Sequence, residues 1–331
     1  MQNLRLVIAL TLAVFSLTAG AQAERGIVQV SGDLYRAQNN AHFTVFLVTS
    51  EGIIVSDPIN AEFASWLKGE LERRFDRPVR YVLYSHHHWD HASGGAVFAD
   101  TAEFVGHEMM AEMLRLPSAD TPLPGNVADM DANRNGRVER NEAAANLQAQ
   151  FDLYDANGDG ALNGAEVTRG PVSEVHPAGT LFSGRRTVSL GGKTVEMIHV
   201  GPTHSPDMTV LRFPDEDAVF LVDFISAKRL PFRNLPGYDI DQLVATIESV
   251  EALDFSIAVG GHGAIGTKQD VADHRRYLLE LREAVAAGIR AGQSLEQLQS
   301  NITMAAYSDW ASFNWLGENI AGMHRILTSS E

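Results

Sequence analysis

Cysteine is absent from all 331 residues of the sequence. Disulfide bonds and thiolate metal sites are therefore excluded, and any metal must be held by histidine, carboxylate or carbonyl groups. Basic residues are also scarce: 26 lysines and arginines stand against 42 aspartates and glutamates, which gives a formal net charge of −16. Because nucleic acid binds to cationic surfaces, this charge argues against a nucleic-acid partner. We expect a small-molecule substrate instead.

Long apolar runs are missing after residue 23. The one such run, LVIALTLAVFSLTAG, follows Arg5 and precedes Ala21-Gln22-Ala23, a pattern of small residues typical of signal-peptide cleavage. We therefore expect residues 1–23 to be a signal peptide that is cleaved after Ala23, and the protein to be secreted or periplasmic. The run is short for a membrane span, so no span is expected after cleavage. The sequence leaves the oligomeric state open.

Strand-like and helix-like segments alternate on both sides of a polar, acidic stretch. Short β-rich runs fill residues 27–56, and apolar side chains recur at helical spacing in 61–75 and in 268–299. The β pattern returns after Pro171. This order predicts an α/β layered domain over residues 24–331, interrupted by a small module at 124–171.

The segment S-H-H-H-W-D-H at 85–91 follows an apolar strand candidate at 79–84. In an extended segment, side chains two positions apart point the same way, so His86 and His88 can reach one metal. Asp90 and His91 form a second pair that can serve a second metal. A solvated polyhistidine loop is the alternative interpretation. So many strong ligands directly after a buried strand favour a metal site.

Further candidate ligands lie just past the ends of other apolar runs, where the sheets of α/β folds gather their sites. They are Asp57, His204, Asp223 and His262. Each alone would be weak support, since a single histidine or strand-end aspartate is usually structural. Together with the 86–91 segment they predict a site with two metals.

The H-x-H-x-D-H spacing, and the order of the residues that follow it, resemble the metallo-β-lactamase superfamily. The resemblance implies an αββα sandwich and assigns the ligands. It places His86, His88 and His204 on one metal and Asp90, His91 and His262 on the other, with Asp223 bridging both and Asp57 orienting the metal loop. His87 fills a position that the pattern leaves free, and His42 and His107 are candidate neighbours of the site. Imidazole and carboxylate ligands suit two zinc ions best, and iron or manganese remain open.

The resemblance also implies hydrolysis of an ester, lactone, thioester or amide bond. Two metal ions would share a hydroxide that forms near neutral pH, and Asp90 would be catalytic by orienting it or moving a proton. An aspartate bridge is typical of thioesterases, lactonases and phosphate- or sulfate-ester hydrolases of the superfamily. A periplasmic β-lactamase and an iron-dependent oxidoreductase of the same fold are the alternatives. Lys228 and Arg229 could meet a substrate carboxylate or phosphate, or could be a solvated basic pair.

Two twelve-residue segments of the acidic module, 131–142 and 155–166, fit the EF-hand calcium loop. Each has glycine at the sixth position and glutamate at the twelfth. The expected ligands of the first loop are Asp131, Asn133, Asn135, the Arg137 carbonyl, Glu139 and Glu142. Those of the second loop are Asp155, Asn157, Asp159, the Ala161 carbonyl, Asn163 and Glu166.

The two loops depart from the EF-hand pattern because they begin only 24 residues apart, at positions 131 and 155. Segment 143–154 must therefore serve as the exit helix of one loop and the entry helix of the next. Pro124 and Pro171 leave little room for the outer helices. We expect a small helical module with one or two structural calcium ions, which would fold the insert into a flap near the metal cleft.

Overall fold

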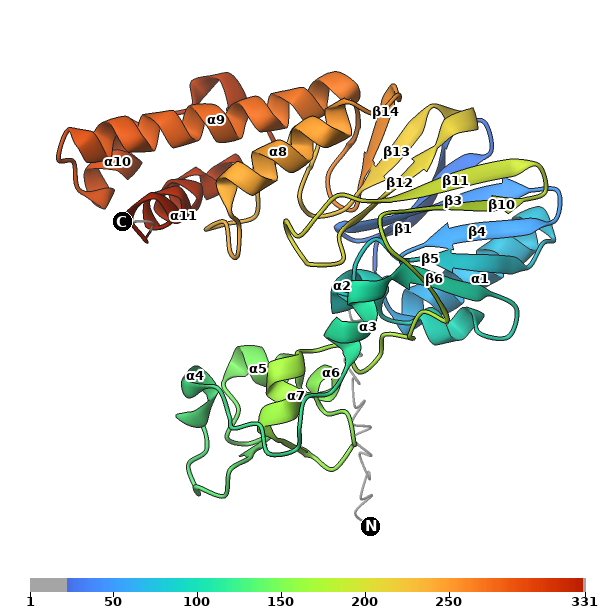
Figure 1. The fold of residues 1–331 in the computed structure, drawn as a ribbon, viewed down its shortest axis with the longest axis horizontal. Helices are drawn as coiled ribbons and strands as arrows, with labels where there is room; N and C mark the ends of the chain where they lie inside the picture. The colour runs from blue at the N-terminus through green and yellow to red at the C-terminus, as the bar shows by residue number, and fades with distance from the viewer. Residues whose placement is uncertain (1–22, 330–331) are drawn as a thin grey trace, which may run out of the picture.

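The computed structural model describes residues 23–329, so residues 1–22 of the predicted signal peptide lie outside the described residues. Two mixed β-sheets pack face to face, with helices on their outer faces (Figure 1). The α/β layered domain predicted from the sequence is thus confirmed.

The first sheet has seven strands in the order β1-β2-β3-β4-β5-β6-β9. The strands β1 to β4 pair antiparallel, whereas β4, β5, β6 and β9 pair parallel. Asn40 closes the β2–β3 turn at φ 55°, a left-handed conformation that asparagine tolerates. The strands are β1 (Arg25–Ser31), β2 (Leu34–Asn39), β3 (His42–Thr49), β4 (Gly52–Ser56), β5 (Val79–Leu83), β6 (Glu103–His107) and β9 (Thr180–Phe182).

The second sheet has six strands in the order β10-β11-β12-β13-β14-β15. Only β13 and β14 pair parallel, and the other pairs are antiparallel. The strands are β10 (Arg185–Leu190), β11 (Lys193–His199), β12 (Thr209–Phe213), β13 (Ala218–Leu221), β14 (Ile257–Gly260) and β15 (Ile265–Thr267).

A layer of buried aliphatic and aromatic side chains from both sheets fills the space between them. Val45 and Leu83 come from the first sheet, and Met197 and Phe220 from the second. All four are fully buried, and removing such apolar surface from water is the main favourable term that holds sheets together.

The outer faces of the sheets are covered by long amphipathic helices. Helix α1 (Ala61–Phe75) covers the first sheet, and the side chain of Asn60 caps its first turn by accepting from the Phe63 N–H. Helices α8 (Ile240–Glu251) and α9 (Lys268–Arg290) cover the second. The helical spacing over 268–299 is filled by two helices, because Gly292 turns left-handed and Ser294 caps a new helix, α10 (Leu295–Asn301). The remaining elements of this part are α2 (Trp89–Ala92), α3 (Glu108–Leu114), α11 (Leu316–Ser329) and the short 3-10 helices η1 (Gly95–Phe98), η2 (Pro214–Glu216), η3 (Ala305–Tyr307) and η4 (Phe313–Trp315).

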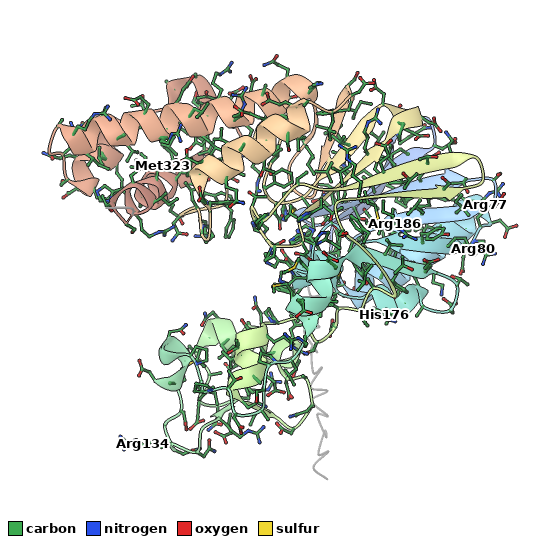
Figure 2. The ribbon with its side chains drawn as sticks, viewed as in Figure 1. Arg77, Arg80, Arg134, His176, Arg186 and Met323 are labelled. Carbon is green, nitrogen blue, oxygen red and sulfur yellow. The ribbon has the colours of Figure 1, made fainter. Side chains whose placement is uncertain are left out.

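Residues 124–171 form a small module that stands apart from the two sheets (Figure 1). It has a core of its own, built by Val127, Val138, Leu147, Phe151 and Leu162. In Figure 2, Arg134 lies at the far end of this module. Its elements are α4 (Gly125–Ala128), β7 (Val138–Glu139), α5 (Ala145–Ala149), α6 (Phe151–Tyr154), β8 (Ala161–Leu162) and α7 (Gly164–Arg169).

The outer helices of the module, α4 after Pro124 and α7 before Pro171, are as short as the sequence predicts. Figure 2 also labels Arg77 and Arg80, which lie at the edge of the sandwich away from helices α8 and α9. A bilayer-crossing helix, with the necessary length and apolar character, does not occur between residues 23 and 329.

Candidate metal centre

The predicted metal ligands meet at one edge of the sandwich, because each follows the end of a strand. His86 and His88 lie in the extended segment after β5, and α2 carries Asp90 and His91 one turn further. His204 lies in the connection between β11 and β12. Asp223 follows β13 and His262 follows β14, so the parallel pairing of these two strands brings both residues to the same edge.

The first cluster contains His86, His88, His204 and Asp223, whose candidate ligand atoms all lie within 4.8 Å of one another. The Nε2 atom of His204 is 3.0 Å from Nδ1 of His88 and 3.3 Å from Oδ2 of Asp223. His86 Nε2 is also 3.3 Å from that oxygen. Three ring nitrogens and one carboxylate oxygen therefore converge on one point.

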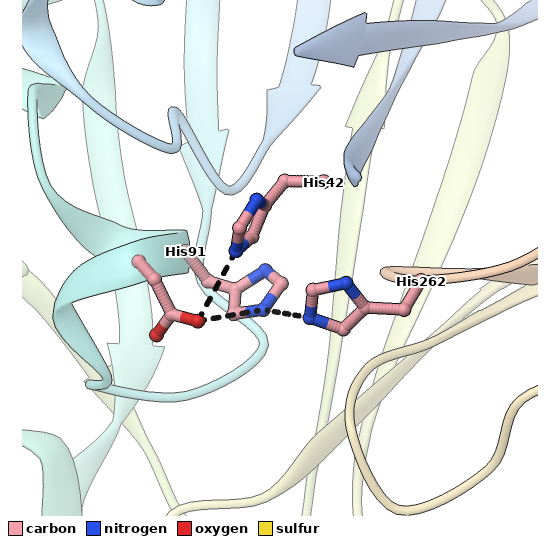
Figure 3. A group of neighbouring side chains, drawn as sticks. His42, His91 and His262 are labelled. Carbon is pink, nitrogen blue, oxygen red and sulfur yellow. Dashed lines mark hydrogen bonds and ion pairs between the residues drawn. The ribbon is translucent and has the colours of Figure 1, made fainter. Parts of the chain in front are cut away.

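The second cluster contains His42, Asp90, His91 and His262, again with ligand atoms within 4.8 Å (Figure 3). His91 Nε2 and His262 Nε2 are 3.2 Å apart, and His42 Nε2 is 3.3 Å from Asp90 Oδ2. Asp223 reaches this cluster through Oδ1, which is 3.2 Å from His91 Nε2 and 3.1 Å from His262 Nε2. The two oxygens of Asp223 thus face different clusters.

These donor sets fit divalent cations. The buried Nε2 of His86 and Oδ1 of Asp223 make only the close contacts given above and no hydrogen bond, although such buried atoms are normally satisfied. Ring nitrogens that face each other at 3.0–3.2 Å repel unless a proton or a cation lies between them. Imidazole nitrogens with one or two carboxylate oxygens are ligands typical of zinc.

The charges of the clusters shift the pKa values of their members. Burial and the neighbouring histidines lower the pKa of His88 to about 2. Burial also lowers the pKa of His91, but the carboxylate of Asp223 outweighs it and raises that pKa to about 9. Burial raises the pKa of Asp223, yet the nearby histidines hold it well below its ordinary value. A bound cation would therefore compete with a proton on His91, not on His88.

Contacts behind the ligands select the ring nitrogen that faces the metal position. Asp57 is 0% exposed and accepts from the Ser85 N–H at 2.8 Å and the Ser85 Oγ–H at 2.6 Å. The Ser85 hydroxyl in turn lies 2.9 Å from Nδ1 of His86 and can accept its proton. This chain of contacts leaves Nε2 of His86 free for a metal.

Two further ligands are oriented in the same way. Nδ1 of His262 donates to the Ala41 carbonyl at 2.8 Å. The hydroxyl of Tyr238 donates to the Asp223 carbonyl at 2.9 Å and lies 3.3 Å from Nδ1 of His204. Nε2 of each histidine is left to face the cluster.

Sequence reasoning missed several of these contacts. It named His42 only as a possible neighbour, although the structure places it among the candidate ligands. It left His87 unassigned, and His87 Nδ1 lies 2.9 Å from Asp207 Oδ1, which ties the 86–91 segment to the His204 loop. His107, the other named neighbour, stacks on His199 with ring centroids 3.8 Å apart. No sequence signal marked Tyr238 or Asp207, because neither belongs to a recognisable spacing.

A cavity of about 400 Å³ lies over both clusters. Its floor includes the candidate ligands His42, His88, Asp90, His204, Asp223 and His262. Its wall is mostly apolar and is formed by Phe224, Pro231, Phe232, Pro236 and Leu243, with Tyr238 and Arg229. Every lining residue lies outside 124–171, so the insert does not line this cavity, and its role as a flap near the metal cleft stays a prediction.

The two loops of the insert wrap around their first aspartate. Gly136 and Gly160 have φ of 83° and 82°, which favours glycine. Their N–H groups donate to Asp131 Oδ2 at 2.8 Å and to Asp155 Oδ2 at 2.9 Å. The loops lie side by side because β7 and β8 pair antiparallel. Each of these turns is formed by contacts within its own loop. Among residues 23–329, the acidic groups of the loops do not form a close cluster of candidate ligand atoms like the two clusters of the metal centre.

The closing glutamates bond to the backbone of their own loops. Glu142 accepts from the N–H groups of Asn133 and Glu139, and Glu166 from those of Ala156 and Asn163. The other expected ligands lie in the same loops: Asn135, Arg137, Asn157, Asp159 and Ala161.

The Arg137 side chain crosses from the first loop to the second. Its guanidinium donates to Asp159 Oδ1 at 2.6 Å and to the Ala161 carbonyl at 2.9 Å. Both groups are expected calcium ligands, so a cationic side chain already contacts part of the second loop.

Comparison with known proteins agrees with this geometry. A sequence model of the Metallo-beta-lactamase superfamily matches residues 55–262. The 2,4-dinitroanisole O-demethylase subunit alpha of Nocardioides sp. (strain JS1661) is 24% identical over 291 residues, which are 86% of this chain and 69% of that protein. The linear primary-alkylsulfatase of Pseudomonas sp. (strain ATCC 19151) is 22% identical over 218 residues, 64% of this chain and 40% of that protein.

Solved structures share the fold at low sequence identity. The stereoselective inverting sec-alkylsulfatase from Pseudomonas sp. has a TM-score of 0.59 at 13% identity, over 91% of this chain and 50% of that chain. A metallo-beta-lactamase from Pontibacter korlensis has a TM-score of 0.53 at 15% identity, over 77% of this chain and 99% of that chain. This chain spans half or less of the length of the two alkylsulfatases. With the family match over most of its length and two histidine–carboxylate clusters where metals would lie, the chain belongs to the metallo-beta-lactamase superfamily and is one of its metal-dependent hydrolases.

Proposed function

We propose that this hydrolase is a dinuclear zinc enzyme that cleaves an ester, lactone, thioester or amide bond. The observation that carries the proposal is Asp223, whose Oδ2 faces the first cluster and whose Oδ1 faces the second. A carboxylate in that position can hold two cations close enough to act on one substrate. When bound, two zinc ions supply a hydroxide nucleophile near neutral pH and polarise the bond that is attacked.

The side chains around the clusters have separate roles in this proposal. Burial raises the pKa of Asp90, but contact with His42 and the charge of His91 outweigh it and hold that pKa below its ordinary value. An ionised Asp90 that lines the cavity can orient an attacking water and accept its proton. The apolar wall holds the organic part of the substrate and excludes water from the opposite side.

Sulfate esters are a second candidate substrate class. The proposal is supported by two of the similar proteins, which are named as a linear primary-alkylsulfatase and a sec-alkylsulfatase. A cavity with an apolar wall above a floor that two bound zinc ions would make cationic would suit an alkyl chain that ends in a sulfate.

A substrate panel on protein of known metal content tests these proposals. The panel contains lactones, thioesters, carboxylic esters, aryl and alkyl sulfates, and a cephalosporin. We expect turnover that follows zinc content, disappears on chelation and returns with zinc. Turnover that requires iron and consumes oxygen would instead favour the oxidoreductase alternative.

Asp223→Asn is the decisive variant in that panel. It keeps the left-handed backbone of Asp223, which asparagine tolerates, but it removes the bridging charge. We expect loss of bound zinc and a fall in kcat of about a hundredfold or more. Asp217→Asn is the matched control, because Asp217 is also left-handed but is exposed at the opposite end of β13. Full turnover in Asp223→Asn would refute the dinuclear proposal.

We further propose that the insert binds one or two calcium ions with a structural role. The support is the double match to the twelve-residue loop pattern, with glycine at each sharp turn. Adding calcium to zinc-loaded, calcium-free protein should raise the melting temperature and protect 117–171 from proteolysis. Glu142→Gln with Glu166→Gln should abolish both effects. Identical melting and cleavage with and without calcium would contradict the proposal.

We also propose that the protein is exported, on the strength of the apolar run and the Ala-Gln-Ala pattern before residue 24. Amino-terminal sequencing of the protein recovered from the producing cells tests this directly. The expected first residue is Glu24, whereas an intact Met1 in the recovered protein would refute cleavage after Ala23.

A further inference from the structure

Arg229 is a cation in the cavity wall that interacts electrostatically with Asp223 but has no direct ion pair among the described residues. Among residues 23–329, no carboxylate forms an ion pair with it, and it is the one lysine or arginine that lines the cavity. Its two nearest basic neighbours along the chain differ in this respect. Lys228 Nζ lies 4.0 Å from Asp270, and Arg233 lies 3.4 Å from Glu318.

The guanidinium of Arg229 is held in place by packing. Its Cζ atom lies 4.9 Å from the ring centroid of Trp315, a distance at which a cation is attracted to the face of an indole. The residue is half-buried, and burial lowers the pKa of its guanidinium. The charge of Asp223 opposes this shift without forming a direct ion pair, so the donors of the guanidinium remain open to an anion in the cavity.

The residues around Arg229 indicate the chemistry of a ligand that would bind there. Phe224 and Phe232 line the same cavity, and Phe232 remains 49% exposed at its edge, 5.3 Å from the Trp315 ring. His274 also lines the cavity, is 2% exposed, and has an Nδ1 atom without a hydrogen-bond partner. A ligand that satisfies this wall has an apolar body and an anionic group.

We propose that Arg229 binds an anionic group of the substrate, a carboxylate or a sulfate, while Phe224 and Phe232 hold its hydrocarbon part. This inference rests on the proposed hydrolytic function and narrows its substrate class to amphiphilic anions. The planar guanidinium presents paired N–H donors that match the oxygens of either group. Stacking on Trp315 orders those donors before the substrate arrives, so less conformational entropy is lost on binding.

Paired substrates separate the role of the charge from the hydrolytic activity itself. The neutral probe is p-nitrophenyl butyrate, the carboxylate probe is the mono-p-nitrophenyl ester of glutaric acid, and the sulfate probe is p-nitrophenyl sulfate. Each is assayed with zinc-loaded, full-length protein, as the unmodified chain and as Arg229→Gln. Lys228→Gln is the matched control, because it removes the adjacent positive charge outside the cavity.

In Arg229→Gln we expect kcat/KM for one anionic probe to fall by about tenfold or more, mainly through KM. The neutral probe should change by less than about twofold, and Lys228→Gln should leave all three unchanged. The anionic probe that loses activity identifies the group that Arg229 binds. Arg229→Lys should recover part of the loss, because it restores the charge without the paired donors. Equal losses for neutral and anionic probes, or no loss for either anion, would overturn the proposal.

A binding measurement keeps the inference testable if none of the probes is cleaved, an outcome that would refute the hydrolytic proposal for these esters. Calorimetric titration compares hexanoate, hexyl sulfate and hexan-1-ol on the zinc-loaded protein. We expect at least one anion to bind about tenfold more weakly to Arg229→Gln, with hexan-1-ol unchanged. An anion held only by zinc would bind both proteins equally, which would refute the role of Arg229. Melting curves of each variant verify that the fold is intact.

Discussion

Replacing Asp57 with asparagine should weaken one zinc site and spare the other. Asp57 touches no candidate metal position itself, because both its oxygens accept from Ser85. In Asp57→Asn an amide NH₂ replaces one of these acceptors, so either the N–H or the hydroxyl of Ser85 faces a donor. The Ser85 hydroxyl then loses the orientation in which it can accept from His86 Nδ1 at 2.9 Å. His86 would no longer be held with Nε2 toward the first cluster.

The size of the effect follows from this geometry. Losing a partner that orients a metal-binding histidine typically weakens metal affinity by about 10- to 100-fold. That corresponds to about 1.4–2.8 kcal/mol at 25 °C. The buried site also loses stability, because an unsatisfied donor costs about 1–3 kcal/mol. Asp57 is completely buried, so solvent does not offset this cost.

Zinc affinity is measured by competition with a fluorescent chelator, which resolves two successive equivalents. We expect the equivalent held by His86, His88 and His204 to weaken and the other to keep its affinity. Asp254→Asn is the control, because the Asp254 side chain is 98% exposed. Unchanged affinity at both sites, or equal weakening of both, would refute the reasoning.

Three further predictions concern residues outside the superfamily pattern. His42→Ala should weaken zinc at the second cluster by about tenfold, since His42 Nε2 lies among its ligand atoms, and unchanged affinity in the chelator assay would exclude it as a ligand. Burial lowers the pKa of His274 from 6.5 to about 4, so between these pH values the unfolded chain binds the extra proton and the zinc-free protein loses stability as the pH falls. Denaturant unfolding should show a contribution of about 2 kcal/mol lost between pH 7 and pH 5, absent from His274→Asn, and equal pH slopes for both proteins would contradict the assigned burial effect. Arg137→Gln should tighten calcium binding at the second insert loop because it removes the guanidinium from Asp159, and weaker binding in a calcium titration would show that Arg137 supports the loop instead.

The fold followed closely from local patterns, with failures at particular turns. Helix α1 begins and ends where its apolar spacing and flanking residues indicate, because capping and periodicity act over a few residues. The apolar spacing over 268–299 indicated helix correctly but not the break inside it, because Gly292 and Ser294 end one helix and begin another while the spacing continues. The expected flap position of the insert could not be derived in the same way, because it depends on contacts made by the whole molecule.

The sequence by itself determined which side chains could hold metal, because ligand type, short spacing and position after a strand are local properties. The dense segment at 86–91 and the strand-end Asp223 and His262 needed no tertiary information. Only the tertiary structure decided which partners these residues meet. His42 comes from a different hairpin than the other ligands of its cluster. Arg229 lies in the cavity wall beside Trp315, which is distant from it in the sequence. Such long-range contacts depend on how the two sheets and their covering helices pack. Packing is determined by the shape and burial of side chains across the whole chain, and a short segment of sequence does not contain that information.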